Sequence, residues 1–182
     1  MLPEVELYLA RLSALRNDTL KTMEGASAGV LNWKPTARET NSMFVLATHL
    51  LGSERHWIHR VVGGLTIARD RDAEFRARGK DAENFRGEYA ALAQASAEIL
   101  ARLSEAELSA PRVTPNYGTV SARWAIVHLI EHYAEHAGQM SLTRQVWEAG
   151  QQSKSKKHAL SVAEGRKAKS RKSPVKRARG KK

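Results

Sequence analysis

The chain has 182 residues and no cysteine, which excludes disulfides, thiolate nucleophiles and zinc–sulfur sites. Its acidic N-terminus does not resemble a signal peptide, and no apolar run approaches the roughly 18 residues of a membrane span, so we expect a cytoplasmic protein. The net charge of +11 is unevenly distributed along the chain. Residues 151–182 hold 13 Lys or Arg and one acidic residue, whereas residues 1–150 hold 17 Lys or Arg and 18 acidic residues. The composition therefore predicts a near-neutral globular domain, residues 1–150, followed by a cationic tail, residues 151–182.

The first half of the domain predicts two long helices. Apolar residues recur at three- and four-residue steps over residues 3–23, behind a proline of the kind tolerated in a first turn. A second helix is expected over residues 43–62, between a polar N-cap and a pair of glycines. His49 lies on the apolar stripe of this second helix, whereas His59 lies near its polar end and is expected in solvent.

The second half predicts two more helices. Residues 65–83 are charged and weakly patterned, which indicates a loop with one helical turn at most. A third helix is expected over residues 84–103, a proline-containing connection follows, and the fourth helix runs over residues 120–148 and stops at Gly150. No stretch predicts a strand. The fold class we expect is therefore all-α, a four-helix bundle.

Three histidines of the fourth helix, His128, His132 and His136, recur every fourth residue and so share one face. Four residues of helix rise about 6 Å and eight rise about 12 Å. A metal–nitrogen bond is only about 2.0–2.1 Å long, so one ion can join either neighbouring pair but not all three. A further ligand must come from another helix, as in bundles that build metal sites between facing helices.

Three sequence fragments carry a resemblance to a known family. They are LNWKP at Leu31–Pro35, HLLGSERHWI at His49–Ile58 and HYAEHAGQ at His132–Gln139. In this order, and on these helices, they resemble the DinB/YfiT-like superfamily of four-helix metal proteins, and the resemblance spans roughly residues 5–150.

The resemblance implies a ligand set. In that family one histidine of the second helix and two ligands four residues apart on the fourth bind one divalent metal, which corresponds here to His49, His132 and His136. The pattern around His128 and Glu131 is also similar to a branch once labelled a domain of unknown function. In that branch and in mycothiol-dependent members the position of His132 is commonly a glutamate, whereas here it is a histidine, as in the DinB-like members.

The resemblance also implies an activity, because the superfamily includes S-transferases and isomerases that use bacillithiol or mycothiol. Three imidazoles suit Zn, Ni, Fe or Co and leave coordination positions open for a ligand. We expect a metal-dependent thiol S-transferase, or a hydrolase-like enzyme, that acts on a small molecule with a supplied low-molecular-weight thiol. Cleft candidates are His128, Glu54 and Tyr117. The alternative is a non-enzymatic metal-binding or stress-response protein. Family members often form homodimers through helix faces.

The tail has almost no large apolar residues and is expected to be disordered. Clustered Lys and Arg bind nucleic acid by neutralising phosphates, whatever the sequence of the bases. The tail therefore predicts nonspecific nucleic-acid binding, and its candidate contacts are Lys169, Arg171, Lys172, Lys176, Arg177 and Arg179.

Overall fold

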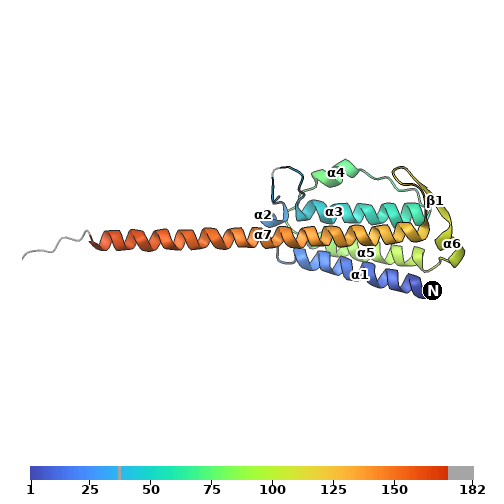
Figure 1. Ribbon diagram of the computed structural model, residues 1–182, viewed down its shortest axis with the longest axis horizontal. Helices are drawn as coiled ribbons and strands as arrows, with labels where there is room; N and C mark the ends of the chain where they lie inside the picture. The colour runs from blue at the N-terminus through green and yellow to red at the C-terminus, as the bar shows by residue number, and fades with distance from the viewer. Residues whose placement is uncertain (37, 172–182) are drawn as a thin grey trace, which may run out of the picture. The chain divides into compact units, whose positions relative to one another are not determined.

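The computed structural model describes residues 1–36 and 38–171, with side chains up to residue 158. The chain divides into two compact units, Met1–Gln145 and Val146–Lys182. Long helices dominate the described part (Figure 1): α1 (Pro3–Met23), α3 (Met43–Glu54) continued by η1 (Arg55–Val62), α5 (Glu83–Leu100) and α7 (Ala122–Arg171). The predicted four-helix bundle is confirmed, and it lies in the first unit.

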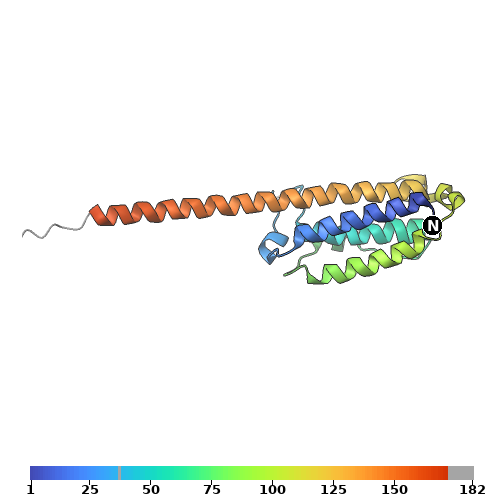
Figure 2. The same ribbon diagram turned by 90° about the horizontal axis from the view of Figure 1, so that it is seen from below.

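The helices of the bundle run in parallel pairs. Phe44 of α3 contacts Phe85 of α5 with ring centroids 5.0 Å apart, and further along Ser96 of α5 donates to Glu54, so α3 and α5 run the same way. Figure 2 shows α1 and the first part of α7 side by side, and a guanidinium at each end of α7 in the bundle bonds to the matching end of α1. Because α3 and α5 are parallel, the chain must return along the bundle between them.

That return, residues 63–82, carries the short helix α4 (Arg71–Arg76), which packs on α3. Its N-cap is Asp70, whose carboxylate accepts a hydrogen bond from the amide of Ala73 at 2.8 Å. The sequence predicted a loop with one helical turn here, and the turn is α4. A crossover of this kind lays loop residues over the side of the bundle, where they can reach side chains of α3.

The core is the apolar stripe of each helix. Most residues of the stripes predicted from three- and four-residue spacing are buried, and they form the core of the bundle. The largest fully buried side chains include Leu12, Leu46, Leu50, Tyr89 and Tyr133. Ser42 caps α3 by accepting from the amide of Val45, as the sequence indicated. The helix then widens into the π-helix η1, which closes with a bond from the Gly63 amide to the Ile58 carbonyl.

Two parts of the bundle differ from the sequence prediction. The expectation that the chain contains no strand was wrong, because β1 (Pro111–Thr114) and β2 (Gly118–Ser121) form an antiparallel hairpin. The turn uses Gly118 at φ 65°, a conformation that glycine adopts without strain. His59 was expected in solvent but is buried at 9% exposure, where its Nε2 lies 3.1 Å from Ser96 Oγ. The π-helix turns His59 inward toward α5.

The fourth helix also ends elsewhere than expected. It continues through Gly150 to Arg171, whereas the sequence placed its end near residue 148 and a disordered tail from residue 151. A single glycine costs a helix only about 1 kcal/mol relative to alanine, so it need not end one. Residues 172–182 lie outside the described residues. Within the described part, none of the helices combines the length and the apolar character that crossing a membrane requires.

Candidate metal centre

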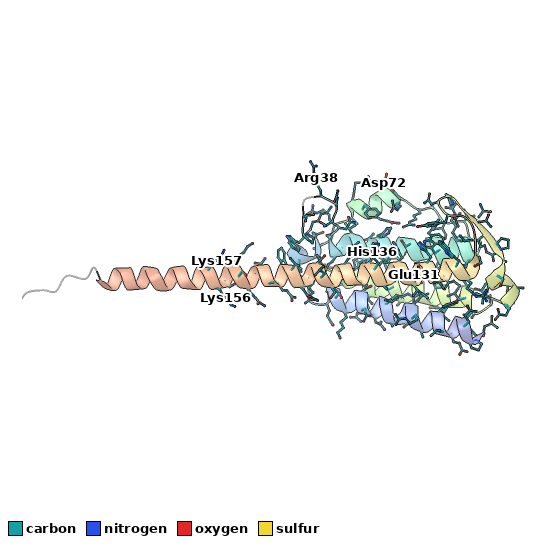
Figure 3. The ribbon with its side chains drawn as sticks, in the orientation of Figure 1. Arg38, Asp72, Glu131, His136, Lys156 and Lys157 are labelled. Carbon is teal, nitrogen blue, oxygen red and sulfur yellow. The ribbon has the colours of Figure 1, made fainter. Side chains whose placement is uncertain are left out.

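Three imidazoles converge between α3 and α7. His49, His132 and His136 each offer a nitrogen, and these atoms all lie within 4.8 Å of one another. His49 Nε2 lies 3.0 Å from His132 Nε2, and the ring centroids of His132 and His136 are 4.3 Å apart. Figure 3 shows His136 on the part of α7 beside α3. Of the two neighbouring pairs on α7 that spacing left open, the structure brings the pair 132 and 136 to His49.

The imidazoles of His49 and His136 are each oriented by a hydrogen-bond partner at Nδ1, the ring nitrogen that is not offered to the metal. His49 Nδ1 lies 2.9 Å from Glu74 Oε2, and His136 Nδ1 lies 2.8 Å from the amide oxygen of Gln139. A carboxylate and an amide oxygen can only accept here, so both Nδ1 atoms carry the proton. Both Nε2 atoms therefore keep a lone pair, which is the state that binds a metal.

Glu74 is held in turn by Arg69, and neither residue was found from the sequence. Arg69 donates from Nε to Oε1 at 2.7 Å and from Nη2 to Oε2 at 2.8 Å, in a bidentate pair. Burial raises the pKa of the Glu74 carboxyl, but the hydrogen bonds from Arg69 and His49 outweigh it, so the pKa is lowered overall. The carboxylate therefore stays ionised and fixes the tautomer of His49. The signal available in the sequence was the Asp70 cap, which positions α4.

The crossover also shields the histidines. Phe75 of α4 lies over the His49 ring, with centroids 4.7 Å apart. His49 and Ser53 are buried, and the Ser53 hydroxyl lies 3.4 Å from His49 Nε2 and 3.3 Å from His132 Nε2. His132 and His136 are half-buried. The cluster is thus closed on the α4 side and accessible along α7.

Burial and neighbouring imidazoles keep His132 and His136 neutral at physiological pH. Burial, and then the neighbouring imidazoles, lower the pKa of His132 to about 3. Burial likewise lowers the pKa of His136. Protonating imidazoles that lie this close together is unfavourable, because the positive charges would repel one another. In the neutral state their nitrogen lone pairs can bind one cation together.

The donor set fits a divalent ion. Two nitrogens 3.0 Å apart can both lie about 2.1 Å from one point, so the Nε2 atoms of His49 and His132 are already spaced as ligands. The ligand nitrogens of all three residues lie within 4.8 Å of one another, close to twice that bond length, about 4.2 Å, so small movements of the rings would bring all three to one ion. Three nitrogen ligands leave at least one coordination position open.

The cleft candidates lie in two different surroundings. His128 stacks on Trp124, with centroids 4.9 Å apart and planes 6° apart, and it also contacts Tyr117 and Trp57. Its ring lies 6.1 Å from that of His132. His128 and Tyr117 are thus brought together beside the histidine cluster, in an aromatic group that the sequence did not predict as a group.

Glu54, in contrast, lies fully buried in a network of its own. Its carboxylate forms a bidentate pair with Arg16 of α1, and it accepts from Ser96 of α5 at 2.5 Å and from Tyr133 of α7 at 2.8 Å. One carboxylate therefore joins all four helices of the bundle. Its hydrogen bonds are satisfied within the core, which favours a structural role over the cleft role that the sequence suggested.

The tail candidates lie largely outside what the structure describes. Lys169 and Arg171 belong to the last turns of α7, where only the backbone is described. The other tail candidates, Lys172, Lys176, Arg177 and Arg179, lie outside the described residues.

Comparisons with known proteins agree with the fold and identify the family. Similar solved structures include a DinB-like protein of Bacillus subtilis (18% identity, TM-score 0.59). The match covers 78% of this chain and 92% of the Bacillus subtilis chain. A conserved protein of Enterococcus faecalis (15%, TM-score 0.62) covers 80% and 97%, and a DinB-like protein of Bacillus cereus (18%, TM-score 0.62) covers 80% and 92%. At these identities they show the fold alone. No curated protein matched the chain. A family model described as mycothiol S-transferase matches residues 8–149, which include nearly all of the bundle and its three histidines, and the chain therefore belongs to the mycothiol S-transferase family of DinB-like proteins.

Proposed function

We propose that this protein is a metal-dependent thiol S-transferase in which His49, His132 and His136 hold one divalent ion. The observation that carries the proposal is the convergence of three imidazoles from two helices, with one nitrogen of each within 4.8 Å of the others. The family match supports the reaction class and points to mycothiol as the thiol. Because the chain has no cysteine, the sulfur must come from such a small molecule.

A bound divalent ion would lower the pKa of a coordinated thiol and so supply a thiolate at neutral pH. The residues of the chain prepare this site. Glu74 holds the tautomer of His49, and Arg69 balances the charge of Glu74. Phe75 covers one side of His49 and keeps bulk water from that face. In the transfer, a carbon–sulfur bond forms, the leaving group departs with its electron pair, and the thiol proton passes to water.

Elemental analysis combined with a thiol assay tests this proposal. Purified wild type should contain about one equivalent of Zn, Ni, Fe or Co, the metals that imidazole ligands suit, and should consume mycothiol in the presence of 1-chloro-2,4-dinitrobenzene. His132→Ala should lose both the metal and the activity. His158→Ala removes an exposed histidine outside the bundle and should keep both. Metal-loaded wild type that consumes no thiol across a panel of electrophiles would refute the transferase and leave the alternative, a metal-binding protein without this reaction.

A second function is favoured by the basic end of α7. Lys154, Lys156 and Lys157 are exposed on this helix, and Figure 3 shows Lys156 and Lys157 directed outward. We propose that residues 151–182 bind nucleic acid without sequence preference, because regularly placed lysines neutralise phosphates. Removing residues 151–182 should abolish DNA binding that weakens steeply with salt. Binding that survives the deletion unchanged would contradict the proposal.

A further inference from the structure

Four rings form one cluster beside the histidines: Trp57 from η1, Tyr117 from the β1–β2 turn, and Trp124 and His128 from α7. We call these four residues the aromatic cluster. Trp124 and His128, one helical turn apart, are stacked in parallel. Trp57 and Tyr117 contact both of them and each other, with centroid distances between 4.8 and 5.9 Å. Three elements that are distant in sequence thus place their rings at one point.

The cluster is anchored inside and open outside. Trp57 is 6% exposed and packs in the bundle, whereas Trp124 is 38% exposed and Tyr117 is 50% exposed. Side chains of this size bury most of their area when they serve only to stabilise a core. A tryptophan and a tyrosine that face water side by side, on a rigid base, form a surface on which a flat ligand can stack.

The cluster is continuous with the proposed metal site. The ring of His128 lies 6.1 Å from that of His132, and the two planes differ by only 16°. Tyr117 and Trp124 both contact His128, so a molecule held against either of them would lie beside the ring that adjoins a proposed metal ligand. That is the place from which a second substrate could meet a thiolate held by the ion.

The chemistry of the cluster selects its ligand. Two indoles and a phenol make up most of the cluster, in contact with the imidazole of His128. Indole and phenol rings have electron-rich faces, which stack best on electron-poor rings. Electron-poor planar rings are also the ones that a thiolate attacks.

We propose that the aromatic cluster binds the electrophilic substrate and selects planar, electron-poor aromatic electrophiles. This rests on the proposed transferase function. The matching step is aromatic substitution: the thiolate sulfur forms a bond to the ring carbon, and the leaving group, chloride in a chloronitroarene, departs with the bonding electron pair. No oxidant or reductant is required. Trp124 and Tyr117 position the ring, and the histidine site holds the sulfur.

Binding of an unreactive probe tests the cluster without the reaction. The probe is 1,3-dinitrobenzene, titrated calorimetrically into metal-free full-length protein. Wild type and His132→Ala should bind it alike, and Trp124→Leu should weaken binding about tenfold, a loss of about 1.4 kcal/mol. Trp33→Leu removes an indole outside the cluster and is the matched control. Tyr117→Leu, on the exposed turn, serves if Trp124→Leu does not fold. A probe that binds all of these proteins equally, or none of them, overturns the proposal.

Steady-state kinetics then separate this proposal from the transferase itself. In Trp124→Leu, kcat/KM should fall about tenfold for 1-chloro-2,4-dinitrobenzene and change less than about twofold for iodoacetamide, which has no ring to stack. Equal losses for both electrophiles would overturn the cluster's role while leaving the transferase intact. If wild type turns over neither electrophile, the transferase fails, and the probe titration alone decides whether the cluster is a binding site for flat rings.

Discussion

One methyl group at Gly52 should loosen the metal centre without touching a ligand. A Cβ atom built on Gly52 would lie 1.9 Å from Glu74 Oε1 and 2.6 Å from its Cδ. Carbon and oxygen cannot approach so closely, so in Gly52→Ala the Glu74 carboxylate must leave its position. With it go the 2.9 Å contact to His49 Nδ1 and the bidentate pair with Arg69. The His49 ring is then free to rotate or change tautomer.

The size of the effect follows from that lost partner. Removing the carboxylate behind a histidine ligand commonly costs about 10–100-fold in metal affinity, which corresponds to about 1.4–2.7 kcal/mol. Alanine in place of glycine also stabilises a helix by up to about 1 kcal/mol, so metal-free Gly52→Ala need not be less stable overall. Affinity and folding stability should therefore change independently, which separates an effect on the site from a general loss of structure.

Competition with a chromophoric zinc chelator at pH 7.5 measures the affinity. Gly52→Ala should bind Zn about 10–100-fold more weakly than wild type. Gly87→Ala is the matched control, because it lies in α5 with no atom within 4 Å of the new methyl group, and its affinity should be unchanged. If the methyl group acts through Glu74, then Gly52→Ala/Glu74→Ala binds no more weakly than Glu74→Ala. A Gly52→Ala protein with wild-type affinity, or a double variant far weaker than both single ones, would refute the reasoning.

Three further predictions concern stability. Glu54→Ala leaves Arg16 buried without its partner and should cost about 3–5 kcal/mol in urea unfolding, whereas Arg55→Ala breaks an exposed pair with Glu88 and should cost under about 1 kcal/mol; equal costs would contradict the buried role. Burial lowers the pKa of His59 in the folded state, so below about pH 6.5 the unfolded chain binds more protons and the folded state loses stability as the pH is lowered. Metal-free His59→Asn should therefore lose less stability than wild type when the pH is lowered from 7.5 to 5.5. Parallel curves of stability against pH for the two proteins would exclude this contribution. Zn at about 100 times its dissociation constant should add about 2.7 kcal/mol and raise the melting temperature, and a chelator should reverse this; no shift with bound metal would mean that the unfolded chain binds it too.

The long helices and the histidines of the cluster could be predicted from the sequence. The residues that orient and cover those histidines could not. Periodicity located α1 at its observed bounds because its apolar stripe is long and uninterrupted. The four-residue repeat on α7 gave two possible histidine pairs, and the choice between them needed the resemblance or the structure. A one-dimensional pattern cannot say which helix faces which, so periodicity alone did not identify His49 as the partner of this pair. The resemblance implied it, and in the structure the three residues lie together.

What the sequence missed comes from contacts that leave no periodic trace. Glu74 and Arg69 lie in a charged crossover and act through α3, which the local pattern does not reveal. The β1–β2 hairpin has four residues in each strand, too few for an alternation to stand out, and Val113 within it is 84% exposed. Tyr117 and Trp57 meet only because that hairpin folds over the end of η1.

The four-way junction at Glu54 has a consequence for how this architecture can vary. Glu54 directly follows Ser53 on α3, and its partner Tyr133 directly follows His132 on α7, so the junction fixes the axial alignment of the two helices that supply the imidazoles. Sliding either helix by one turn, about 5.4 Å, would separate the histidines and break the junction at the same time, so the junction opposes the slide. The loops at the ends of the bundle therefore need not set this alignment. They can lengthen, shorten or be recut while the spacing of the nitrogens is preserved by a single carboxylate in the interior.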